Sequence, residues 1–273
     1  MPKARVNGVE LHYEVGGKGY PLVFVHAYPL TLDMWGPQVE YLSRNFRVVT
    51  YDARGFGKSE APPAPEAYSQ ETAIEDLFQL MKHLGIKKGC VIGLSMGGNI
   101  ALNLALRHPE ILHGVVAADT GAGSDDPKAF HRLVEEWAKA ADAGGIEAFA
   151  DLILAHPIFA GYVARGEEAE RQFRAMITAN TTRGVANAAR RVLGRRPPIY
   201  DLEARLVKME LPVLVIVGEN DEPALPPSMF LGEKIPEGDL RLIHDAGHFC
   251  NLELPDIFND AVERFVNAAS GVE

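Results

Sequence analysis

One serine lies in a setting that favours nucleophilic chemistry. Residues 93–98 read GLSMGG, so Ser95 occupies the centre of a G-x-S-x-G pattern. An apolar run ends here and a helical pattern begins, and this strand-to-helix context is the one that a serine nucleophile on a sharp turn requires. Small residues let the backbone pass close to its neighbours, and the start of the helix directs free N–H groups at whatever Ser95 attacks. The pattern therefore predicts Ser95 as a nucleophile.

A serine needs a general base, and the base needs a carboxylate that orients it. His248 is the favoured base because it lies beside a glycine, in the sequence DAGHF, just beyond the last predicted strand. Asp221 is the favoured acid because it follows the preceding strand, in the sequence GENDE. Asp119 remains an alternative acid at the end of an earlier strand, and Glu219 and Glu222 are neighbours of Asp221. No metal site is expected.

These residues need elements that bring them together. An Asn-Gly pair between short β-type runs predicts a hairpin at the N-terminus. Apolar runs alternating with helical segments predict a largely parallel sheet covered on both faces. The expected strands are 21–26, 46–52, 90–95, 112–119, 211–218 and 240–244, and the expected helices are 31–43, 70–84, 96–108, 226–234 and 255–269.

The middle of the chain follows a different pattern. It is rich in alanine, shows no strand, and places Phe130, Leu133, Val134 and Trp137 on one helical face. We therefore expect an α/β core formed by residues 1–122 and 198–273, interrupted by a helical cap formed by residues 123–197.

Composition narrows the possible partners and location. The chain has 273 residues, 47% of them hydrophobic, and 27 basic against 37 acidic residues give a net charge of −10. This charge argues against binding to nucleic acid or to an anionic membrane surface. Cys90 and Cys250 are too few for a disulfide framework, and the N-terminal residues contain no apolar signal-peptide core. We expect a cytoplasmic protein, with a homo-oligomer left open.

The motifs together resemble the α/β-hydrolase superfamily over essentially the whole chain. The likeness includes the sequence HAYP at 26–29, DARGFGKS at 52–59, the Ser95 turn, and the chain order Ser95, Asp221, His248. Within the superfamily, the Ser95-Met96 pair and the segment 29–35 resemble small serine esterases grouped with 3-oxoadipate enol-lactonases and cofactor-free haloperoxidases.

The resemblance implies a mostly parallel eight-stranded sheet with helices on both faces and a helical cap insertion. It also implies an oxyanion hole formed by the backbone N–H groups of Tyr28 and Met96. Ala27 stands where relatives usually have glycine, so a positive φ there would strain the Tyr28 loop. His26 and Asp52 are expected to be structural, and no cofactor is implied. The expected pocket residues are Tyr28, Trp137, Phe149, His156, Phe159, Leu225 and Phe249.

A serine nucleophile with an oxyanion hole predicts a carboxylic-ester hydrolase acting on small esters through an acyl-enzyme. Relatives that open epoxides or displace halide use an aspartate instead, so those activities are excluded. Enol-lactone hydrolysis and perhydrolysis would use the same catalytic residues, and the first would need a cation such as Arg183 or Arg190 for the substrate carboxylate. A slow-turnover ligand receptor is the non-enzymatic alternative. The expected partners are a small-molecule ester and water.

Overall fold

A single eight-stranded sheet organises the molecule, as the sequence predicts. The computed structural model describes residues 2–271. The strands are β1 (Lys3–Val6), β2 (Val9–Gly16), β3 (Pro21–Val25), β4 (Arg47–Tyr51), β5 (Gly89–Leu94), β6 (Leu112–Ala118), β7 (Val213–Gly218) and β8 (Gly238–Ile243). Their spatial order is β1-β2-β4-β3-β5-β6-β7-β8. The pairs from β4 to β8 are parallel, whereas β2 is antiparallel to both of its neighbours.

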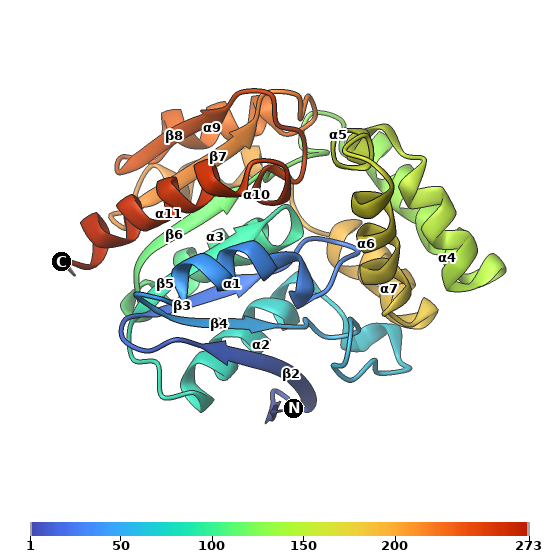
Figure 1. The fold of residues 1–273 in the computed structure, drawn as a ribbon, viewed down its shortest axis with the longest axis horizontal. Coiled ribbons are helices and arrows are strands. Elements are labelled where there is room, and N and C mark those ends of the chain that lie inside the picture. Colours follow the sequence, from blue (N-terminus) through green and yellow to red (C-terminus); the bar gives the residue numbers. More distant parts are fainter. Residues whose placement is uncertain (1, 272–273) are drawn as a thin grey trace.

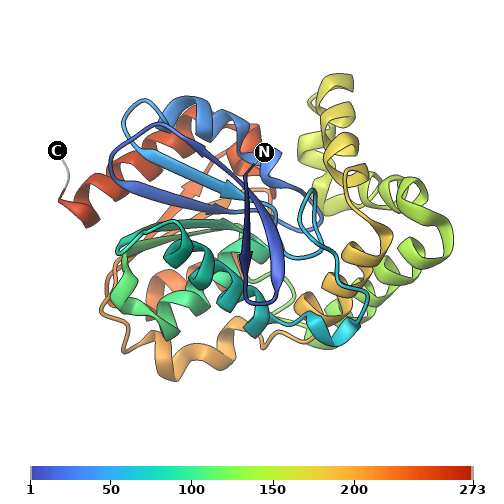
Figure 2. The ribbon, with the colours of Figure 1, turned by 90° about the horizontal axis from the view of Figure 1, so that it is seen from below.

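Helices cover both faces of the sheet. Figure 2 shows α1 and α11 on one face and α2 and α3 on the other, with the strands between them. The helices of the core are α1 (Gly36–Leu42), α2 (Gln70–His83), α3 (Met96–Arg107), α8 (Glu203–Leu206), α9 (Leu225–Lys234), α10 (Cys250–Glu253) and α11 (Pro255–Ser270), with short 3₁₀ turns at Leu32–Trp35, Pro65–Ala67, Pro109–Ile111 and Ile199–Leu202. Strands β5 and β7 are buried along their whole length, as strands covered on two faces should be.

Local sequence signals account for several element boundaries. Asn7 and Gly8 both have positive φ, at 46° and 75°, and connect β1 to β2 as the predicted tight hairpin. Pro109 follows the end of α3 and starts a separate 3₁₀ turn. The helix expected over 31–43 instead begins as a 3₁₀ turn and becomes α-helical only at Gly36.

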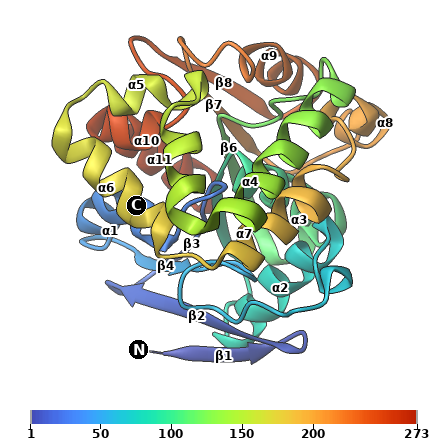
Figure 3. The ribbon, with the colours of Figure 1, turned by 90° about the vertical axis from the view of Figure 1, so that its right-hand side faces the viewer.

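A helical insertion joins β6 to β7 and lies at the carboxyl ends of the parallel strands (Figures 1 and 3). It contains α4 (Pro127–Leu154), a 3₁₀ turn (Pro157–Phe159), α5 (Ala160–Val163), α6 (Glu167–Thr178), α7 (Thr182–Ala188) and a π-helical turn (Ala189–Leu193). The Asp126 side chain caps α4 by accepting from the Ala129 N–H at 2.9 Å.

The long helix α4 is bent rather than continuous. Gly145 has φ 78° and ψ −178°, a conformation that interrupts the helix and that glycine adopts without strain. Both halves of α4 contact the ring of Tyr28, through Trp137 before the bend and Phe149 after it. Within residues 2–271, no single helix has the length and apolar character to cross a membrane, and only α4 together with Pro157–Val163, bent by 67°, meets that test by length and composition.

Candidate active site

The predicted nucleophile lies on a strained turn between β5 and α3. Ser95 has φ 55° and ψ −110°, outside the regions that side-chain-bearing residues usually adopt. Its N–H donates to the Ala118 carbonyl at 2.8 Å, which anchors the turn to β6. A Cβ on Gly97 would lie 2.0 Å from the Val25 carbonyl oxygen, so this position has no room for a side chain. The turn therefore exposes Ser95 at the amino end of α3.

His248 and Asp221 form a buried pair at the carboxyl ends of β8 and β7. The His248 Nδ1 lies 2.7 Å from Asp221 Oδ2, and both residues are at most 3% exposed. An Nδ1–H donor to this carboxylate leaves Nε2 as the basic nitrogen. His248 and Ser95 line the same cavity, although no hydrogen bond joins their side chains in the described chain. Such contacts often tighten only when a substrate binds.

The loop that carries His248 is held by a residue that sequence reasoning missed. Glu253, which is 3% exposed, accepts from the Gly247 N–H at 2.8 Å and from the Phe249 N–H at 3.1 Å. These two bonds fix the backbone on both sides of His248. A glutamate five residues after the histidine, at the end of the short helix α10, is the only sequence signal that could have pointed to this role.

Opposing effects act on the pKa of His248. Burial lowers it, but the charge and hydrogen bond of Asp221, with smaller contributions from Asp119 and Glu253, outweigh burial and raise it above its usual range. Asp119 is also fully buried, and its Oδ1 accepts from the Gly218 N–H at 2.8 Å. Burial, together with the nearby Asp221, raises the pKa of Asp119 well above its usual range. Of the two candidate acids, Asp221 is the one that contacts His248.

His26 and Asp52, from the HAYP and DARGFGKS segments, stabilise loops through backbone hydrogen bonds. His26 Nε2 accepts from the Ala53 N–H at 2.9 Å, and its Nδ1 lies 2.9 Å from the Ala27 carbonyl. Asp52 accepts from the Leu32 and Lys58 N–H groups, each at 2.9 Å. Burial lowers the pKa of His26, which favours the neutral form that these bonds require.

The predicted oxyanion-hole donors are free to bind a ligand. Met96 is the first residue of α3, so its N–H has no partner within the helix. The Tyr28 N–H also donates to no protein group in the part of the chain described. Ala27 is absent from the residues with positive φ, so its methyl group imposes no strain of the kind anticipated. The Tyr28 hydroxyl donates to the Val185 carbonyl at 3.3 Å and thereby ties the loop to α7.

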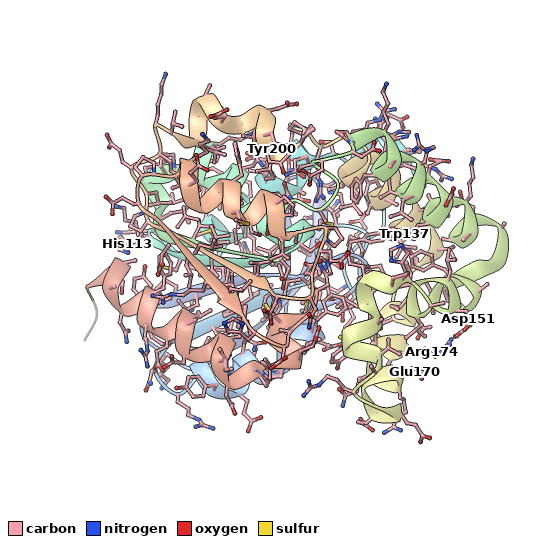
Figure 4. The ribbon with its side chains drawn as sticks, turned by 90° about the horizontal axis from the view of Figure 1, so that it is seen from above. His113, Trp137, Asp151, Glu170, Arg174 and Tyr200 are labelled. Atoms are coloured by element: carbon pink, nitrogen blue, oxygen red, sulfur yellow. The ribbon has the colours of Figure 1, made fainter. Side chains whose placement is uncertain are left out.

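A small cavity joins the core to the insertion. Its volume is about 30 Å³. Tyr28 and Trp137 form part of its wall with their rings stacked, 5.8 Å apart and 11° from parallel. Figure 4 shows Trp137 on the inner side of the bent helix α4, whereas Asp151, Glu170 and Arg174 lie together at the outer edge of the insertion. The lining residues are Tyr28, Ser95, Ala122, Phe130, Trp137, Ile158, Phe159, Leu193, Arg196 and His248.

Only part of the predicted pocket lines this cavity. Tyr28, Trp137 and Phe159 do, but Phe149 and Phe249 are fully buried in a second layer behind Tyr28 and Phe159. His156 packs edge-on against Trp137 with ring centroids 5.3 Å apart, and Leu225 begins α9; neither reaches the lining. Helical spacing identifies an apolar face, but it does not tell which of its side chains reach the cavity and which pack behind them.

The expected cations of the insertion lie elsewhere. Arg190 forms ion pairs with Glu135 at 3.1 Å and Asp142 at 2.7 Å, and Arg183 is exposed to solvent. Neither of these two arginines, which the enol-lactone alternative offered as cations, lines the cavity. Arg196 lines it instead. Among residues 2–271, no group of three or more His, Cys, Asp or Glu side chains could hold a metal ion.

Comparisons with known proteins agree with this architecture. The sequence profile of the alpha/beta hydrolase fold matches residues 20–255. The chain belongs to the α/β-hydrolase family. Three similar proteins illustrate the range of this α/β hydrolase's relatives. A putative carbamate hydrolase RutD from Agrobacterium fabrum is 30% identical over 85% of the chain and 87% of its own length.

Two solved structures are similar over nearly the whole α/β hydrolase. The enol-lactonase from Burkholderia xenovorans LB400 is 31% identical, with a TM-score of 0.86 over 97% of this chain and 100% of its own. A thermophilic esterase from Thermogutta terrifontis is 29% identical, with a TM-score of 0.86 over 98% and 99%. The family and these relatives make the protein a hydrolase.

Proposed function

We propose that this α/β hydrolase is a serine carboxylic-ester hydrolase that acts on small esters through an acyl-enzyme. The observation that carries the proposal is that one cavity is lined by a strained serine at a helix start, a histidine paired with a buried carboxylate, and Tyr28, whose backbone N–H is unpaired. The N–H of Met96, the residue next to Ser95, is the second unpaired donor. The relatives named as an esterase and an enol-lactonase support the same chemistry, because a lactone is a cyclic ester.

In the proposed reaction, Ser95 Oγ attacks the ester carbonyl carbon while His248 Nε2 takes the hydroxyl proton. The N–H groups of Tyr28 and Met96 stabilise the negative oxygen of the tetrahedral intermediate, and each such donor is typically worth about 2.7–4 kcal/mol. His248 then protonates the departing alcohol. Water attacks the acyl-enzyme with His248 again as the base, which releases the acid and restores Ser95. Asp221 holds the imidazole in place and stabilises its protonated form.

A labelling experiment combined with a rate screen tests this proposal. A fluorophosphonate probe should modify the protein once, and peptide mass spectrometry should place the adduct on Ser95. Initial rates should be measured on small esters, lactones and carbamates, and with hydrogen peroxide as a competing acceptor. Repeated turnover on esters is expected. A single burst without turnover would indicate the receptor alternative, and an adduct on another residue would contradict the assignment of Ser95.

A further inference from the structure

The two edges of the sheet differ in what they offer to another strand. β8 forms one edge and β1 the other, at opposite ends of the sheet (Figure 3). An edge strand presents unpaired N–H and C=O groups to which a strand of another molecule can bind, so folded proteins protect such edges. Charge protects β1, whose exposed side chains are Lys3 and Arg5. A second β1 paired against it would oppose basic groups to one another, which is unfavourable.

β8 has no such protection and leaves a row of backbone groups open. The Glu237 carbonyl accepts from the Val213 N–H and the Ile243 carbonyl accepts from the Glu219 N–H, each at 2.9 Å. Because successive residues of a strand direct their backbone groups to opposite sides, the odd-numbered residues of β8 bind β7. The N–H and C=O groups of the even-numbered residues, with Leu240 at the centre, therefore lie on the open edge. The strand contains no proline and pairs with β7 without a bulge.

Exposed apolar side chains gather around this edge. Seven large hydrophobic side chains are exposed among residues 2–271, and four of them lie on β8 or on α9 and α11, the helices that contact β8. These four are Leu240, Leu242, Met229 and Ile257, and the last two are the most exposed of the seven, at 61% and 53%. Apolar surface beside an open strand edge favours association with another molecule.

We propose that β8 pairs with the β8 of a second copy of this chain, in an antiparallel ladder around a two-fold axis beside Leu240. Side chains that oppose each other across a ladder lie on the same face of the sheet, so a residue can oppose only itself or a residue an even number of positions away. The register centred on Leu240 places Asp239 of each copy opposite Arg241 of the other. Registers centred on Asp239 or on Arg241 would instead oppose like charges.

The backbone and the existing ion pair both suit this register. Leu240 directs its N–H and C=O to the open edge, so the two copies of this residue can exchange two hydrogen bonds at the axis. Within one chain, Arg241 Nη2 lies 3.0 Å from Asp239 Oδ2, with both side chains more than half exposed. An exposed pair of this kind contributes little stability, so exchanging it for two pairs between copies costs little. Two-fold dimers are also the commonest protein assembly. The proposal does not depend on the proposed reaction.

Light scattering coupled to size-exclusion chromatography tests the dimer. The wild-type protein should have twice the mass of one chain. Leu240→Lys brings two ammonium groups together at the axis and should raise the dissociation constant roughly tenfold or more. Val15→Lys is the matched control, because Val15 is an equally exposed strand residue, at 44% against 38%, but lies on the inner strand β2. It should remain dimeric. Far-UV circular dichroism verifies that each variant is folded.

Two outcomes of that experiment would overturn the proposal. One is a wild-type protein that stays monomeric at about 100 µM, a concentration at which a specific dimer should form. The other is a folded Leu240→Lys protein that dimerises as strongly as the wild type.

Exchanging the charges tests the register and does not require Leu240 to change. Asp239→Arg and Arg241→Asp each oppose like charges in their own dimer, so each variant alone should dimerise roughly tenfold more weakly or worse. Mixed together, the two variants should form a heterodimer, because opposite charges then meet at both positions. The double variant Asp239→Arg, Arg241→Asp should dimerise like the wild type for the same reason. Native mass spectrometry distinguishes these species.

The recovery is what a general effect on folding or solubility would not produce. Single variants that dimerise like the wild type, or single variants that stay monomeric when mixed, would overturn pairing through β8 in this register.

Discussion

The α/β core and the helical insertion shape the same cavity by different means. In the core, backbone packing positions the groups: Ser95 is held between Ala118 and a glycine that has no room for a methyl group. In the insertion, side chains form the wall: Trp137 and Phe149, on either side of the bend at Gly145 in α4, both contact Tyr28. From this difference we expect the core to govern the rate on every substrate and the insertion to govern which substrates fit.

The largest effect should follow from removing the nucleophile or its base. Ser95→Ala and His248→Ala should each lower kcat roughly 10⁴-fold or more on all esters, because the two groups act as one unit. Steady-state assays on a short and a medium ester measure this. Ser43→Ala, at the end of α1, is the matched control and should leave the rate unchanged. Residual activity within about tenfold of wild type would remove Ser95 or His248 from the mechanism.

The next largest loss of activity should distinguish the catalytic roles of the two buried aspartates, Asp221 and Asp119. Asp221→Asn loses the carboxylate 2.7 Å from His248 Nδ1 and should lower kcat by about 10³- to 10⁴-fold. Asp119→Asn keeps an oxygen for the Gly218 N–H and should lower kcat less than about tenfold, because Asp221 and not Asp119 bonds to His248. The reverse order would move the catalytic acid to Asp119.

Below the pKa of His248, kcat/KM should fall about tenfold for each unit by which the pH is lowered. Only neutral His248 can accept the serine proton, and its pKa is raised by Asp221, so the inflection of kcat/KM should lie above the ordinary value of about 6.5. Since Asp221→Asn removes the raising effect, the inflection should move to lower pH as the rate falls. A wild-type rate that stays constant from pH 8 to pH 4 would contradict a histidine base.

The sequence predicted the core better than the insertion for a physical reason. Apolar strands end next to Ser95, Asp221 and His248, and parallel strands align their carboxyl ends at one edge, so chain position alone brings these residues together. The hairpin at Asn7-Gly8 and the serine turn follow from backbone requirements that few residues satisfy. Sequence signals of this kind are local and specific.

The cavity wall depends instead on how side chains pack in three dimensions. Arg196 lies in the segment Arg195-Arg196-Pro197-Pro198, which has the composition of a linker, and nothing local indicates that its guanidinium reaches under Phe130. Arg190 lies in the helical insertion, where a residue that faces the cavity would be expected. Its charge is instead paired with Asp142 and Glu135, which lie 48 and 55 residues away in the chain. Glu253 holds the His248 loop by accepting from two backbone N–H groups, and its position five residues after the histidine is too general a signal to predict this role.

The smallest effect should be a shift in acyl-chain preference when a side chain of the cavity wall is truncated. The wild-type protein should prefer p-nitrophenyl esters with acyl chains of a few carbons, because each methylene that fits adds about 0.8 kcal/mol, roughly fourfold in kcat/KM, and one that clashes loses packing energy. Trp137→Ala removes a ring that is 5% exposed and stacked on Tyr28, so the preferred chain should become longer by a few carbons. Leu152→Ala, on the same helix but 40% exposed, should leave the preference unchanged. Initial rates from acetate to palmitate measure both. A wild-type maximum at palmitate would mean that the insertion leaves an open groove. The insertion would then not determine which substrates fit, although the core could still determine the rate.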